Sequence, residues 1–156
     1  MKLSTKGRYA TIAMCDIALH QNVGRVSTSD ISQRQDISKV YLEQIFVKLR
    51  KKGLIIGAKG PGGGYVLSKS PSEIRVLEIL NAADETIDAS YTGVGAKGGK
   101  SGSKAQSMTN RLWEGLSAQV YVYLHNIRLS DVVENGLVPC MALPNILEIS
   151  DDVEVS

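Results

Sequence analysis

This sequence has few of the residues on which catalytic and membrane-spanning proteins depend. Its 156 residues include two histidines, His20 and His125, and two cysteines, Cys15 and Cys140. The histidines do not suggest a Ser/His/Asp, Cys/His or paired-carboxylate set, so no enzyme class is indicated. No run of residues approaches the roughly 18 apolar positions that a membrane-spanning helix requires.

A signal peptide is not expected either. Lys2, Lys6 and Arg8 are followed by an amphipathic helical pattern that Asp16 interrupts, and not by an apolar segment. Cys15 lies within that pattern and is expected to be a small buried hydrophobic residue. With 43% hydrophobic and 22% charged residues the composition is that of a soluble protein, which we expect to be cytoplasmic.

The net charge of +2 is unevenly divided along the chain. Residues 1–66 carry eleven Lys or Arg against four Asp or Glu, whereas residues 67–156 carry seven against twelve. A basic N-terminal half on an acidic C-terminal half is typical of a nucleic-acid-binding head on a body that does not bind. An accidental division with a solvated basic face is the alternative.

The stretch from Thr28 to Leu67 carries the most specific pattern. Ser27 with Asp30 three residues later predicts the start of a helix, and Ser38 predicts the start of a second helix after a short turn. In the second helix the apolar residues are spaced as one buried stripe. They are Leu42, Ile45, Phe46 and Leu49.

The outward residues of the second helix are those of a DNA-reading helix. Short or polar side chains come first, where they would face base edges, and Arg50, Lys51 and Lys52 follow, where they would face phosphates. The outward set is Ser38, Lys39, Val40, Tyr41, Glu43, Gln44, Lys48 and Lys51.

A hairpin is expected directly after the second helix. Residues 54–56 and 65–67 predict two short strands, joined by the glycine-rich turn from Lys59 to Gly64. A helix-turn-helix followed by such a hairpin is a winged helix. The glycine-rich turn lacks the Gly-Lys-Ser/Thr ending of a phosphate-binding loop and opens no helix, so it does not indicate a nucleotide-binding enzyme.

The remaining pattern is helical with one interruption. A first helix is expected within residues 1–22, buried through Tyr9, Ile12, Ala13, Ile17 and Ala18, with Lys2, Lys6 and Arg8 near a DNA backbone. Short helices are expected at Val76–Ala83 and Leu129–Val133. The expected units are a DNA-binding domain (1–83), a Gly/Ser-rich loop (84–107) that is flexible or orders on binding, a dimerisation helix with a short following helix (108–135), and an acidic, disordered tail (136–156).

A long amphipathic helix is expected from Met108 to Asn126. No obvious partner within the chain exists for its apolar side, so we expect it to pair with a two-fold mate, as a helix-turn-helix dimer requires. Packing back on its own head is the alternative. The expected interface residues are Leu112, Trp113, Leu116, Val120, Tyr123 and Leu124. The fold class is therefore mainly α (α+β): a winged helix-turn-helix domain with a long C-terminal dimerisation helix.

Six motifs in order resemble the iron–sulphur cluster regulator (IscR) family of winged-helix transcription factors. They are LSTKGRYA at residues 3–10, DIS at 30–32, YLEQIF with KLRKKGL across 41–54, GPGGGY at 60–65, DETIDA at 84–89 and LWEGLS at 112–117. The resemblance implies a homodimeric repressor or activator that reads a pseudo-palindromic operator in double-stranded DNA. It also implies control of genes for iron–sulphur cluster assembly or related processes.

The resemblance assigns Ser38, Val40, Tyr41, Glu43 and Gln44 to the major groove and residues 59–64 to the wing. Where Lys59 stands the family usually has arginine, and lysine keeps the charge without the planar fork. The full expected DNA-contacting set is Lys2, Lys6, Arg8, Ser27, Thr28, Ser38, Lys39, Val40, Tyr41, Glu43, Gln44, Arg50, Lys51, Lys59, Gly60, Pro61, Gly62 and Gly63.

The loop departs from the family pattern. Cluster-binding members hold a 2Fe–2S cluster with three cysteines and a histidine, but here Thr92, Ser107 and Asn110 stand where two of the cysteines and the histidine would be. Hydroxyl and amide groups cannot replace thiolate, so no cofactor and no metal site are expected in this chain. Natural loss, deliberate replacement of the cysteines, and a cluster held elsewhere, for instance by Cys140, are the three explanations.

There are three alternatives to a DNA-binding regulator without a cluster. An enzyme is not supported by the residues discussed above. A protein-interaction module that has lost DNA binding would not need the basic residues at both ends of the head. A regulator still holding a cluster through atypical ligands stays open.

Overall fold

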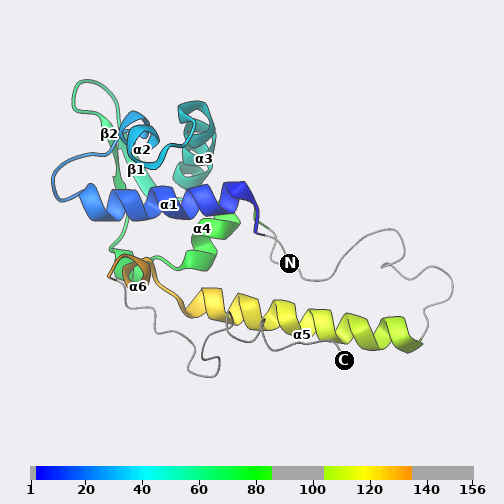
Figure 1. Ribbon diagram of the computed structural model, residues 1–156. Coiled ribbons are helices and arrows are strands. Elements are labelled where there is room, and N and C mark those ends of the chain that lie inside the picture. Colours follow the sequence, from blue (N-terminus) through cyan, green and yellow to red (C-terminus); the bar gives the residue numbers. More distant parts are fainter. Residues whose placement is uncertain (1–2, 86–103, 135–156) are drawn as a thin grey trace, which may run out of the picture.

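The computed structural model describes residues 3–85 and 104–134 (Figure 1). The chain forms α1 (Thr5–His20), α2 (Thr28–Gln35), α3 (Lys39–Lys51), β1 (Ile55–Ala58), β2 (Gly64–Leu67), the 3₁₀ turn η1 (Pro71–Glu73), α4 (Val76–Ala82), α5 (Lys104–Asn126) and α6 (Leu129–Val133). The predicted fold class, a mainly helical winged helix-turn-helix domain followed by a long helix, is confirmed. No helix in the described part of the chain is long and apolar enough to cross a membrane.

Helix α1 lies at the centre of the head and packs against α3, α4, α6 and β2 (Figure 1). Its N-cap is Ser4, whose hydroxyl accepts from the backbone N–H of Gly7. Ala13 and Ile17 are buried as predicted, but Ile12 is 38% exposed, which corrects its predicted place in the buried stripe. The buried face runs through Gly7, Ala10, Ala13, Met14 and Ile17, and Ile12 lies on the opposite side of the helix.

The predicted N-caps of α2 and α3 are present in the structure. The Ser27 hydroxyl accepts from the backbone N–H of Asp30 at 3.1 Å, and the Asp30 carboxylate accepts from the backbone N–H of Ser27 at 2.9 Å. Helix α2 ends at Gln35, its C-cap Asp36 lies in the left-handed region with φ of 52°, and Ser38 caps α3. The predicted stripe of α3 is buried in full, which fixes the rotation of the helix and leaves its other face outside.

The wing is a two-stranded antiparallel sheet in which Ile55 pairs with Leu67 and Ala58 with Gly64. Tyr65 forms a further bridge to Val26, ahead of α2, and its ring meets Phe46 of α3 edge-on with centroids 4.7 Å apart. A side chain at Gly64 would place its Cβ 2.9 Å from the Val26 carbonyl oxygen, so glycine permits this close pairing. The wing is thereby held beside α3.

The C-terminal end of α5 is anchored to the head beside α4 and α6. The Val76 N–H donates to the Ile127 carbonyl at 3.0 Å, and the Leu129 N–H donates to the Ile74 carbonyl at 2.8 Å. The predicted helix began at Met108 after a loop ending at residue 107, but α5 begins at Lys104, which corrects that boundary. The predicted tail, residues 136–156, lies outside the described residues.

Candidate nucleic-acid interface

The outward face of α3 presents a line of unburied side chains. Positions 40, 43, 44, 47 and 51 are three or four residues apart, so they share one side of the helix, opposite the buried stripe. Val40 is 66% exposed and Val47 is 59% exposed, and Glu43, Gln44 and Lys51 are exposed as well. The sequence prediction omitted Val47, although its spacing of four residues from Glu43 was a sufficient signal.

Two predicted reader residues also have structural roles. The Ser38 hydroxyl accepts from the backbone N–H of Tyr41 at 3.5 Å and so caps α3. The Tyr41 ring packs edge-on against Tyr9 of α1, with centroids 5.6 Å apart, and is half-buried. Lys39, beside them, is exposed. The first turn of α3 is therefore anchored to α1 while its polar groups remain at the surface.

The predicted residues at the start of α2 are placed differently from one another. Ser27 is half-buried, and both its N–H and its hydroxyl bond to Asp30. Thr28 is buried, with 9% of its surface exposed. Any contact that this helix start makes with a phosphate would therefore use exposed backbone or Ser29 more readily than the Thr28 side chain.

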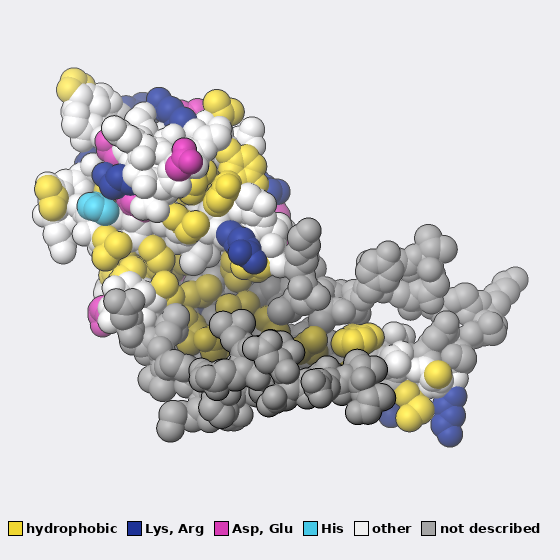
Figure 2. All heavy atoms as spheres, viewed as in Figure 1, with side chains coloured by type: hydrophobic (Ala, Val, Ile, Leu, Met, Phe, Trp, Pro, Cys, Tyr) yellow, Lys and Arg dark blue, Asp and Glu magenta, His cyan; other side chains and the backbone are white. Residues whose placement is uncertain are grey.

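Unburied basic side chains lie on α3, at the start of α1 and on the wing. Arg8, Arg50, Lys51 and Lys59 are exposed, and Lys6 is half-buried. Lys and Arg side chains lie at several places on the face of the head shown in Figure 2. Lys2 lies outside the described residues.

The wing tip is an exposed glycine-rich turn. The Gly63 N–H donates to the Gly60 carbonyl at 2.8 Å, and Gly60 and Gly62 have φ values of 94° and 72°. These left-handed conformations favour glycine and let the backbone approach a surface closely. Lys59 and Pro61 are exposed on the same turn.

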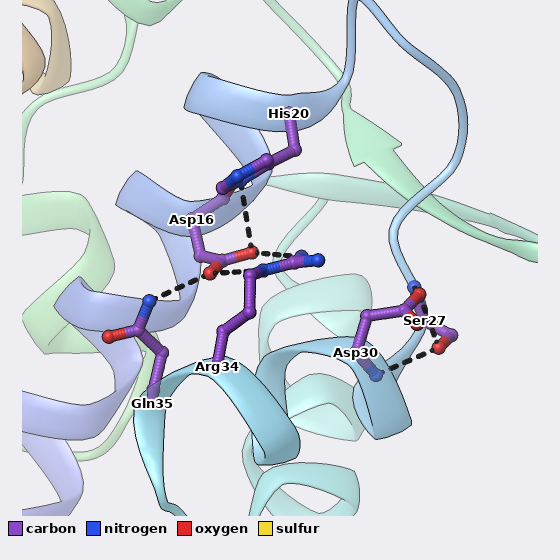
Figure 3. Close-up of polar contacts among 6 residues, drawn as sticks. All are labelled: Asp16, His20, Ser27, Asp30, Arg34 and Gln35. Carbon is purple, nitrogen blue, oxygen red and sulfur yellow. Dashed lines mark hydrogen bonds and ion pairs between the residues drawn. The ribbon is translucent and has the colours of Figure 1, made fainter.

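A buried carboxylate joins the first two helices (Figure 3). Asp16 is 1% exposed and accepts from Arg34 at 2.6 and 3.1 Å and from Gln35 at 2.9 Å. His20 Nδ1 lies 3.5 Å from the same carboxylate. Burial opposes ionisation, but the hydrogen bonds from Arg34 and Gln35 outweigh it and hold the pKa of Asp16 below its ordinary value. The last turn of α2, just before the turn to α3, is thus tied to α1.

Helix α5 leaves much of its apolar surface uncovered within the single chain. Leu112 is 61% exposed, Leu116 and Trp113 are each 41% exposed, and Tyr123 is 58% exposed, while Val120 and Leu124 are partly buried. At the N-terminal end of α5, on the lower right of Figure 2, hydrophobic side chains lie at the surface beside Lys or Arg. Within residues 3–85 and 104–134, only the C-terminal end of α5 is anchored to the head, so these residues do not show the alternative in which α5 packs along its own head (Figure 1).

The family's cluster-ligand positions do not supply a cluster's donors. Ser107 and Asn110 are exposed on the first turns of α5, and Thr92 and Cys140 lie outside the described residues. Within residues 3–85 and 104–134, no group of three or more His, Cys, Asp or Glu side chains could hold a metal ion. Hydroxyl and amide groups do not fit the iron that thiolate holds in cluster-binding members of the family.

A winged helix-turn-helix head with an exposed reading helix and an uncovered apolar arm defines a DNA-binding transcription regulator. The chain belongs to the Rrf2 family of iron-dependent transcriptional regulators, whose family model matches residues 3–135. It is 57% identical over 154 residues to the HTH-type transcriptional regulator IscR of Cereibacter sphaeroides, covering 97% of this chain and 99% of that protein. It is 47% identical over 135 residues to IscR of Serratia proteamaculans, and the match covers 86% of this chain and 80% of that protein.

Solved structures agree with these relatives. The T. potens IscR structure has a TM-score of 0.69 at 33% identity, covering 92% of this chain and 94% of that chain. The structure of CymR, the global cysteine regulator of B. subtilis, has a TM-score of 0.71 at 30% identity, and the match covers 86% of this chain and 98% of that chain. The chain is an IscR-type transcriptional regulator and not an enzyme, as the sequence motifs predicted.

Proposed function

We propose that the chain acts as a homodimer that binds a pseudo-palindromic operator, with one α3 helix in the major groove of each half-site. The outward face of α3 carries this proposal. It combines exposed polar groups that can pair with base edges, at Glu43 and Gln44, with an exposed cation two turns further on, at Lys51. The buried stripe on the opposite side holds this face outward.

In this proposal the basic residues around α3 position the protein without reading sequence. Arg50 and Lys51 contact phosphates beside the groove, and Lys6 and Arg8 do so from the start of α1. The Lys59 turn contacts the backbone or the minor groove beside the wing. A lysine there neutralises charge but lacks the bidentate geometry of arginine.

Dimerisation through α5 would cover the apolar side chains that the single chain leaves exposed. The apolar residues of α5 lie within one arc of the helix, so a two-fold mate can bury them together. They are residues 112, 113, 116, 120, 123 and 124. Two heads held at a fixed separation then match two half-sites. We place this activity in the cytoplasm, at genes for iron–sulphur cluster assembly or related processes.

We further propose that no cluster is held by Thr92, Ser107 and Asn110, so the regulator binds DNA in an apo-like form. The loop would then lack the ligands through which the family responds to iron. A cluster held through other residues, Cys140 included, is the competing possibility.

Fluorescence anisotropy with duplexes selected from a randomised pool tests the proposed function. The wild-type protein should form a specific complex whose affinity falls steeply with salt, because each paired phosphate releases counterions. Lys51→Ala should reduce the slope of log affinity against log salt by about two, one for each subunit of the dimer. A protein-interaction module would instead give no selected sequence and no specific complex, and that result would overturn the proposal.

A further inference from the structure

Two valines on the outward face of α3 have no role in the core. Val40 and Val47 are 66% and 59% exposed, whereas the four apolar residues of the opposite stripe are buried. Glu43 and Gln44 lie between them on the same side of the helix. The two apolar side chains therefore bracket the polar residues that face the DNA in the proposed function.

A valine side chain can neither donate nor accept a hydrogen bond. Among the base edges of the major groove, the C5-methyl group of thymine is the apolar feature that such a side chain can recognise. Valine is branched at Cβ and strongly prefers one χ1 rotamer in a helix, so its methyl groups are held in place before binding. Little side-chain freedom is lost when they meet a partner.

We propose that Val40 and Val47 each contact a thymine methyl group and so restrict the operators that this regulator accepts. This inference rests on the proposed function, because it requires α3 to lie in the major groove. It adds apolar readout at two positions to the hydrogen-bonding readout of Glu43 and Gln44. The occupant of the exposed valine surface is thus the operator itself, and not another protein.

The spacing of the valines predicts the spacing of the thymines. Seven residues of α-helix rise about 10 Å, which corresponds to about three base-pair steps. Each half-site should therefore contain two thymines about three steps apart, on either strand. The bases that face Glu43 and Gln44 should lie between them.

Replacing single thymines by deoxyuridine tests this inference, because that change removes only the methyl group. With the duplex selected by the wild-type protein, two positions in each half-site should lose affinity by about fourfold per methyl group in an anisotropy titration. In Val40→Ala one of these positions becomes insensitive to the replacement, and in Val47→Ala the other does. Val23→Ala is the matched control, because Val23 is 92% exposed but lies outside α3, and it should keep both sensitivities.

Three results of the deoxyuridine experiment would contradict the inference. If deoxyuridine weakens binding equally for the wild-type protein and both variants, the methyl effect belongs to the DNA and the inference is wrong. It is equally wrong if no thymine is sensitive, or if Val47→Ala changes dimerisation or protein association but not the methyl response. A wild-type protein that selects no sequence at all would instead overturn the proposed function.

Discussion

The carboxylate of Asp16 is buried between α1 and α2, and its partners Arg34 and Gln35 come from the last turn of α2. A buried charge is stable only while it is paired, so this residue constrains the angle between the two helices. That angle also determines how α3 is presented, because only the short turn at Asp36 separates α2 from α3.

Arg34→Met should lower the free energy of unfolding by about 2 kcal/mol. This is below the range for a fully buried pair because the Arg34 side chain is 36% exposed. Urea unfolding at pH 7 measures it. Arg25→Met removes an exposed arginine elsewhere in the head and serves as the control. Equal stability of the two variants would show that the pair contributes nothing.

The lowered pKa of Asp16 also predicts a pH dependence. Because the folded-state pKa lies below the unfolded value of about 3.9, the stabilisation is fully present above that pH. It is lost as the pH falls through the folded-state pKa. Asp16→Asn should therefore be less stable than wild type at pH 7, and the difference should shrink below about pH 4. A difference that stays constant down to pH 2 would exclude ionisation as its cause.

Glu43 and Lys51 share the outward face of α3 but should affect binding differently. A carboxylate accepts from cytosine N4 and is repelled by phosphates and by the acceptor edges of other bases, so Glu43→Ala should broaden the set of duplexes bound. Lys51→Ala should weaken all duplexes together. Binding profiles over a randomised site measure both effects, and the same profile change in the two variants would refute the division into reader and positioner.

At the scale of elements, one ion pair and one hydrogen bond join the residues after α4 to α3 and to the start of α1. Lys48 of α3 pairs with Asp84, and the Ser4 N–H, ahead of α1, donates to Glu85 at 3.0 Å. A side chain at Gly7 would place its Cβ 2.6 Å from a Glu85 oxygen, so glycine allows this approach. The residues that lead into the loop thus hold both α1 and α3.

Asp84→Asn should free Lys48 for contact with phosphate. The pairing with Lys48 lowers the pKa of Asp84 and raises that of Lys48, as expected for a pair that keeps both charges. Affinity for non-specific duplex should rise, and the slope of log affinity against log salt should steepen by about 0.9 for each subunit of the dimer. Glu134→Gln removes the same charge beyond α6 and should leave the slope unchanged. Equal slopes in both variants would mean that Lys48 does not reach the DNA.

The elements differ in how well the sequence predicts them. The caps and stripes of α2 and α3 are formed by residues three or four positions apart, so local patterns are sufficient. The start of α5 was placed too late because Lys104–Ser107 resembles the Gly/Ser-rich loop, although extending an existing helix costs little. Asp16 was interpreted as an interruption of the apolar pattern, because periodicity cannot reveal a partner eighteen residues away. The predicted DNA and dimer contacts remain predictions.

At the scale of the whole molecule, the proposed operator recognition requires dimerisation through α5. Leu116 lies near the centre of the apolar arc, and Leu116→Asp would bury an unpaired charge in a dimer seam at a cost of several kcal/mol. Sedimentation should then show a monomer, and affinity for a two-half-site duplex should fall. Ala118→Asp places the same charge on the opposite side of α5 and should remain a dimer. A dimeric Leu116→Asp protein would place the interface elsewhere.

The final prediction concerns the response to iron. A cluster changes DNA binding only through different affinities for the DNA-competent and incompetent arrangements of the head. Thr92, Ser107 and Asn110 provide no thiolate or imidazole, so reconstitution with iron and sulphide under nitrogen should leave operator preference unchanged. Visible absorption and iron content are measured on the same samples.

The Cys140→Ser variant tests whether Cys140 is a ligand of any cluster that the protein incorporates. If wild-type protein incorporates stoichiometric iron and changes its operator preference, while Cys140→Ser does neither, the cluster is held by a ligand set that includes Cys140. If both proteins respond, the ligands are other residues. In either case the apo-like regulator proposed above is wrong, although DNA binding through α3 is not, because the buried stripe that turns α3 outward packs within the head.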